Sequence, residues 1–202
     1  AYNRGSARAN FDATASSKLS FRSSMNFTRE RTDRIQGDNT IEGPLANAIA
    51  VQPNIPIFRQ GTTAFTGPQD GLEYVNPVAL AALDRAPLTT LRFLGNVESI
   101  LAASSRARVT ARLGADYYTL NERRWQSPQV LGSSAVGVTG ISRQGNTTTT
   151  KYLGETFGDV DLLRSDAQRL SLTAGGSVEF NRQEFLFLRG EGFGSDAFQY
   201  VG

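Results

Sequence analysis

The clearest structural pattern in the chain lies between residues 7 and 30, which read ARANFDATASSKLSFRSSMNFTRE. Alanine and phenylalanine occupy the odd positions from Ala7 to Ala13, and polar residues occupy the even positions between them. After a polar interruption at residues 15–18, the alternation resumes at Leu19. Because successive side chains of a strand point to opposite faces, the pattern predicts two strands and a tight turn, with one apolar and one polar face.

The second arm of this ribbon is long for a strand. A strand of about 11 residues, at roughly 3.3 Å per residue and a tilt near 45°, spans a height of about 25 Å. That height matches the apolar band of an outer-membrane β-barrel, whereas strands of soluble proteins more often have about 5 to 6 residues. The stretch therefore favours a segment of an antiparallel transmembrane β-barrel. A soluble, secreted β-sandwich that binds glycans or acts as an adhesin is the alternative.

The overall composition agrees with a barrel and argues against a helical membrane protein. The 202 residues are enough for one domain with a real core. No run of 18 apolar residues exists, so the sequence contains no transmembrane helix. Barrel strands carry their apolar residues on one face only, so a mean hydropathy of −0.31 is compatible with a membrane barrel.

Several classes of function are disfavoured by what the chain lacks. It contains no histidine and no cysteine, which removes Ser-His-Asp and Cys-His catalysis and the usual zinc ligands. A β-helical polysaccharide lyase would need internal repeats of about 20 to 30 residues, and none is visible. We expect no enzymatic activity, no catalytic residue, no cofactor and no metal site. The net charge of +2 and the scattered arginines argue against nucleic acid as a partner.

Beyond the first ribbon, strand patterns alternate with irregular segments. Residues 31–88 and 121–146 are expected to be long outer loops, whereas the other connections are short. This alternation of long and short connections is typical of outer-membrane barrels. Within the first loop, residues 45–51 and 77–83 predict short helices, the second with Asn76 as its N-cap. The strands are expected at 6–14, 19–30, 89–99, 106–120, 147–157, 168–180 and 183–190.

Short stretches over most of the chain follow the order and rough spacing of one protein family. They read GPLANAIA (43–50), PNIPIF (53–58), NPVAL (76–80), RFLGN (92–96), GADYY (114–118), ERRWQSP (122–128) and GFGSDAF (192–198). On these stretches the chain resembles the SusC/RagA group of TonB-dependent outer-membrane transporters. Between residues 145 and 166 it departs from the family pattern, because a threonine run and Asp159-Val160-Asp161 stand where two well-patterned strands are expected.

The resemblance implies a closed barrel of about 22 strands with a plug in its lumen. Such proteins import oligosaccharides, peptides or similar nutrients across the cell outer membrane. A surface lipoprotein of the SusD type acts as their lid, and the TonB complex supplies energy. This chain would be the middle of such a barrel, without a plug domain. Neither terminus carries a start or end signal, so we expect a piece of a longer protein.

Polar side chains of the strands are expected to face the lumen and apolar ones to face lipid. The lumen residues would contact substrate or plug, or would be hydrated and paired across strands. They are Arg8, Asn10, Asp12, Arg22, Asn26, Arg92, Asn96, Glu98, Arg112 and Asp116. The residues expected to face membrane lipid are Phe11, Phe21, Phe27, Phe93, Leu113 and Tyr117.

Apolar residues of the outer loops are expected to contact the lid lipoprotein, or alternatively to anchor the loops on their own barrel. They are Leu45, Ile49, Ile55, Ile57, Phe58 and Trp125. Three roles remain open for Trp125 at this stage. It could belong to an aromatic girdle at the membrane interface, stack on a sugar ring, or fold the loop on itself.

Overall fold

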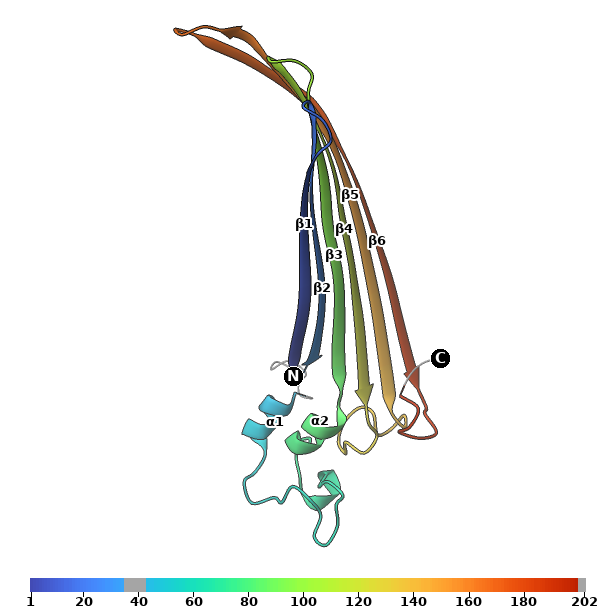
Figure 1. The fold of residues 1–202 in the computed structure, drawn as a ribbon. Coiled ribbons are helices and arrows are strands. Elements are labelled where there is room, and N and C mark those ends of the chain that lie inside the picture. Colours follow the sequence, from blue (N-terminus) through green and yellow to red (C-terminus); the bar gives the residue numbers. More distant parts are fainter. Residues whose placement is uncertain (35–42, 200–202) are drawn as a thin grey trace.

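The computed structural model describes residues 1–34 and 43–199 of the chain. In these ranges the chain forms one six-stranded antiparallel sheet, with the strands in sequence order β1 to β6 (Figure 1). The predicted all-β antiparallel architecture is therefore confirmed. No second sheet packs on it within the described ranges, so the β-sandwich alternative is wrong for this part of the chain. The strands are β1 Tyr2–Thr14, β2 Leu19–Arg34, β3 Ala86–Ala102, β4 Ala107–Gln126, β5 Ile141–Arg164 and β6 Arg169–Glu191.

The last two strands are much longer than the sequence pattern indicates. Residues 147–157 were expected as one strand, but β5 has 24 residues and pairs with β6 along its whole length with a single register shift after Asp161. Residues 168–180 and 183–190 were expected as two strands, but they form the single strand β6. The pattern fails there because threonine occupies both faces of β5, and because Phe185 to Leu188 is apolar on both faces of β6.

The short and the long connections between strands lie at opposite ends of the sheet. The short connections 15–18, 103–106 and 165–168 lie at one end, and the long ones lie at the other, together with Ala1 (Figure 1). The first long connection contains α1 Pro44–Ala50, a 3₁₀ turn Pro68–Asp70 and α2 Pro77–Leu83, so both predicted helices are present. Residues 35–42 of the predicted outer loop lie outside the described residues. No helix in the described ranges has the length and apolar character needed to cross a membrane.

The buried core lies among these connections rather than in the sheet. We call residues 43–85, 127–140 and 192–199 together the loop unit. Its centre is a cluster of Val75, Ala79, Leu80 and Val130, against which Phe65 packs. Among the described residues, every buried apolar side chain belongs to the loop unit or to an adjoining strand end; these are Leu72, Val75, Ala79, Leu80, Trp125, Val130, Ala135 and Ile141.

Two buried asparagines connect the segments of the loop unit. The Asn76 side-chain oxygen accepts from the backbone N–H groups of Val78 and Ala79 at 3.0 and 3.2 Å and so caps α2. Its amide nitrogen donates to the Ile57 carbonyl at 2.8 Å. The Asn47 oxygen accepts from the Val75 N–H at 2.9 Å, which links α1 to the segment before α2. These bonds satisfy backbone groups that would otherwise be buried without a partner.

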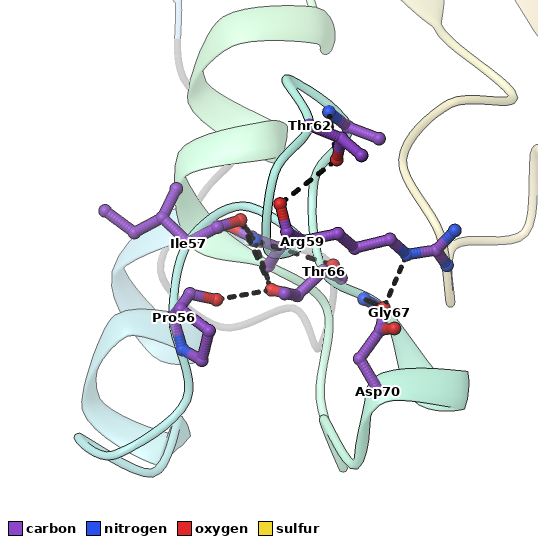
Figure 2. Close-up of polar contacts among 9 residues, drawn as sticks. Pro56, Ile57, Arg59, Thr62, Thr66, Gly67 and Asp70 are labelled. Atoms are coloured by element: carbon purple, nitrogen blue, oxygen red, sulfur yellow. Dashed lines mark hydrogen bonds and ion pairs between the residues drawn. The ribbon is translucent and has the colours of Figure 1, made fainter.

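Figure 2 shows the turn that leads from α1 toward α2. The Thr66 hydroxyl donates to the Pro56 carbonyl at 2.8 Å, and Arg59 Nε donates to Asp70 Oδ2 at 2.8 Å. The same carboxylate oxygen accepts from the Gly67 N–H at 2.8 Å. The hydrogen bond from Arg59, followed by that from Gly67, lowers the pKa of Asp70 below its ordinary value.

Candidate functional site

The register of the sheet places all ten predicted lumen residues on one face. Side chains that are direct partners on neighbouring strands share a face, and every second residue along each strand continues it. Arg8 is the partner of Asn26, and Asn10 lies on the same face two residues further along β1. Leu94 interrupts this face between Asn26 and Asp116. The sheet therefore has one polar face on which all ten predicted residues lie together.

A ladder of alternating charges crosses this polar face. We call it the charge ladder. Each neighbouring pair forms an ion pair: Arg22–Asp12 at 3.9 Å, Arg22–Glu98 at 3.8 Å, Arg112–Glu98, and Arg112–Glu155 at 3.9 Å. Its members come one from each of five strands, in the order Asp12, Arg22, Glu98, Arg112 and Glu155.

A further ion pair, between Arg92 and Asp116, lies on the same face four residues from the ladder along β4. Arg92 donates to both oxygens of Asp116, at 3.0 and 2.7 Å. The arginines of these pairs are largely exposed, whereas Glu98 and Asp116 are partly buried; such pairs at a surface contribute little to stability. The charges therefore make the face hydrophilic and align neighbouring strands, rather than holding the sheet together. Sequence reasoning found four members of the ladder and missed Glu155, because the register of the 145–166 segment was not readable.

The opposite face carries an apolar band, in which the ion pair of Arg182 and Glu184 on β6, opposite Thr150 and Thr148, is a charged exception. The residues predicted to face lipid all lie on it, and Phe27, Phe93 and Tyr117 are direct partners across three strands. The side chains on this face are unusually exposed for their type, with Leu113 at 69% and Val178 at 72%. Aromatic and aliphatic side chains in this band surround a hollow of about 510 Å³ floored by small residues such as Gly95 and Ala115. Such a surface is energetically unfavourable in water.

The predicted lid-contact residues divide into exposed and buried ones. Ile49 on α1 is 80% exposed, and Leu45, four residues earlier on the same side of the helix, is 55% exposed. Ile57 and Phe58 are also exposed, whereas Ile55 is half-buried. Figure 2 shows the Ile57 side chain pointing away from the hydrogen-bonded turn. These residues present an apolar surface on the loop unit.

The predicted lid contact of Trp125 is wrong. It is only 5% exposed, and its ring packs edge-on against Phe193 with the centroids 5.0 Å apart. On another side it lies against Gly140, whose φ is +100° and where an added Cβ would come within 2.6 Å of the indole. Because the ring is enclosed, Trp125 can neither stack on a sugar nor contact a lid. It folds the loop unit on itself, which is one of the three roles considered.

The structure also reveals an arginine row that the sequence pattern missed. Arg124, Arg143 and Arg189 are direct partners across β4, β5 and β6, on the polar face at the end near the loop unit. Arg34 continues the polar face of β2 toward the same end. The arginines continue the alternation of their strands, but Arg34, Arg124 and Arg143 lie outside the strands that were expected at 19–30, 106–120 and 147–157. Only Arg189 lies inside an expected strand, at 183–190.

Comparison with known proteins identifies the fold. No family model matches the chain, and no curated protein sequence matches it. Solved structures that match in fold include one of the RagAB peptide transporter, and two of the RagAB peptide importer in its closed-closed and open-open states. Each has a TM-score of 0.74 at 12% sequence identity and covers 98% of this chain.

The chain has the fold of a SusC/RagA-type barrel segment. It spans only 22% of the length of the matched RagAB chains. At this identity the match establishes the fold alone, and it agrees with the family that the sequence motifs resemble. The sheet itself is open, with β1 and β6 as its two edges.

Proposed function

We propose that this chain is part of the barrel wall of a TonB-dependent nutrient importer in the outer membrane. The observation that carries the proposal is the two-faced sheet, with a charge ladder on one face and a mainly apolar band on the other. In a membrane barrel the first face lines a hydrated lumen and the second contacts lipid. The long connections then lie outside the cell and the short turns lie in the periplasm.

The open edges of the sheet support a larger barrel. The outer edges of β1 and β6 have no partner strand among the described residues, and lipid cannot satisfy unpaired backbone groups. Each edge therefore requires a neighbouring strand from the rest of the protein, in a closed barrel of about 22 strands. This chain alone would not transport.

The proposed partners follow from the position of each surface. The apolar residues Leu45, Ile49, Ile57 and Phe58 of the loop unit are suited to contact a SusD-like lipoprotein lid. The TonB complex would act through parts of the protein outside this chain. The substrate would be an oligosaccharide or a peptide, and the peptide class is the first to test because the matched structures are peptide importers. The wall residues would guide substrate and carry out no chemistry.

Two adjacent serines on β2 allow a direct test of which face of the sheet contacts lipid and which contacts water. Ser23 lies in the apolar band beside Val97, and Ser24 lies on the polar face beside Asn96. In the complete gene product, expressed in an outer membrane, we expect Ser24→Cys to react with a charged, water-soluble maleimide. Ser23→Cys should react only with a lipid-soluble one. The two substitutions are nearly isosteric, so each variant is the control for the other.

Equal labelling of both cysteines by the charged reagent would rule out a membrane barrel. A parallel uptake experiment tests transport itself. Deletion of the gene should abolish uptake of a labelled peptide or oligosaccharide mixture, and the intact gene should restore it. If the two cysteines are labelled as expected but no uptake depends on the gene, the membrane barrel is supported and the importer function is rejected.

A further inference from the structure

The charged residues on the apolar face of the sheet lie at its end near the loop unit. On this face, β2 carries no charge over residues 19–27, and β6 carries none over residues 170–180. These lengths match the roughly 9 to 11 residues with which a tilted strand crosses a bilayer. The charged residues on this face of the described strands are Arg29, Arg31 and Asp33 on β2, Arg123 on β4, and Arg182 and Glu184 on β6. In the proposed barrel, this end of the apolar band lies at the outer headgroups of the membrane.

The charges on β6 are balanced, whereas those on β2 are not. Arg182 and Glu184 lie two residues apart on one face and form an ion pair at 2.5 Å. On β2, Arg31 pairs with Asp33 at 3.7 Å. Arg29 is exposed and forms no ion pair or side-chain hydrogen bond with any described residue. Strand β2 therefore presents one arginine whose charge no carboxylate balances.

The immediate neighbours of Arg29 leave room for an anion. Its register partners are Gly5 on β1 and Leu91 on β3, neither of which is charged. Gly5 borders open space, because even an added Cβ there would meet nothing within 4 Å. Arg31 follows on the same face at a spacing of about 7 Å. An anion placed between the two guanidinium groups can accept hydrogen bonds from both.

On the other side of Arg29 the face is apolar. Phe27 precedes Arg29 on this face and is the direct partner of Phe93. Phe93 and Met25 line the hollow of about 510 Å³ in the apolar band. A ligand that satisfies both regions has an anionic group at one end and a long apolar body. A phosphorylated membrane lipid has this chemistry, whereas a free anion would leave the band uncovered.

We propose that Arg29 and Arg31 bind the phosphate group of a lipid in the outer leaflet, with the acyl chains lying along the apolar band. The inference rests on the proposed membrane barrel, in which this face contacts lipid. Arginine is suited to the role because its planar guanidinium donates two parallel hydrogen bonds to a phosphate. The site is distinct from the lumen, since it lies on the opposite face of the sheet from the charge ladder.

The test uses the purified complete protein in detergent and a matched pair of probes. One probe is lipid A with its phosphates, and the other is the same lipid with the phosphates removed. Native mass spectrometry measures the binding of each, and we expect the phosphorylated form to bind more tightly. Arg29→Gln should weaken that binding by about tenfold, the scale of one charged hydrogen bond, and should leave binding of the dephosphorylated lipid unchanged.

Two further variants predict effects that general damage to the fold would not produce. Asp33→Asn removes the carboxylate that competes for Arg31, so it should tighten binding of the phosphorylated lipid. The double variant Arg182→Gln with Glu184→Gln is the matched control, because it neutralises a balanced pair on the same face. It should bind the phosphorylated lipid as the unaltered protein does.

The outcomes separate this lipid site from the proposed barrel. Equal binding of the two forms of the lipid, or unaltered binding by both Arg29→Gln and Asp33→Asn, would overturn the lipid site. Displacement of the lipid by inorganic phosphate alone would indicate a site for free anions and would also overturn it. In either case, labelling of Ser23→Cys and Ser24→Cys as expected leaves the membrane barrel in place. Equal labelling of both by the charged reagent would instead contradict the barrel itself.

Discussion

The loop unit and the six-stranded sheet obtain their stability in different ways. The loop unit surrounds its own core of Val75, Ala79, Leu80 and Val130 and satisfies its buried polar groups internally. The sheet has two exposed faces, and its apolar side chains such as Leu113 have no partner layer within the described residues. The loop unit is therefore stabilised in water by burial of apolar surface. The sheet instead needs lipid on one face, a hydrated lumen on the other, and further strands at its edges.

The largest expected effect comes from a charge on the apolar face of the sheet. Leu113→Arg should destabilise the complete barrel in lipid vesicles by about 2 to 4 kcal/mol, as expected for arginine near the bilayer midplane. Ser177→Arg is the control, because Ser177 lies on the polar face next to Glu155, where an arginine would extend the charge ladder. Denaturant unfolding in vesicles measures both variants. Equal destabilisation by both would remove the distinction between the two faces.

A smaller effect is expected from the capping asparagine of the loop unit. Asn76→Ala removes the acceptor for two N–H groups of α2 and the donor to the Ile57 carbonyl, at a cost of about 2 kcal/mol. Hydrogen exchange should become faster throughout residues 56–83 and remain unchanged in β3 and β4. Asn54→Ala, at an exposed loop position, is the matched control. Faster exchange in the strands as well would mean that the two regions do not unfold separately.

The smallest expected effect is a loss of stability of the loop unit at acidic pH. The pKa of Asp70 is lower in the folded state than its ordinary value of 3.8, because Arg59 and the Gly67 N–H bind the charged carboxylate. The stabilisation it provides is therefore present at neutral pH and is lost as the pH falls below about 4 toward the folded-state pKa. Protease cleavage of the loop unit should accelerate over that range, and Asp70→Asn should show a smaller acceleration. Identical pH profiles of the two proteins would show that this carboxylate does not contribute.

Sequence alternation predicted the polar and apolar faces of the sheet because the facing of a strand is a local property. Once Arg22 and Phe27 are known to lie on one strand, their separation of five residues places them on opposite faces. The N-cap role of Asn76 was also local, since it depends on N–H groups only two and three residues further along the chain. The same reasoning was weakest in β5, where threonines on both faces remove the alternation while their β-branched side chains still suit a strand.

The sequence by itself thus determined the fold class, the short helices and the division of ten polar and six apolar strand residues between two faces. Only the tertiary structure decided the lengths of β5 and β6, the burial of Trp125 against Phe193, the fifth member of the charge ladder and the arginine row. Each of these depends on which residues distant in the chain become neighbours. Strand pairing and loop packing set those neighbours through contacts that no periodicity of two residues encodes.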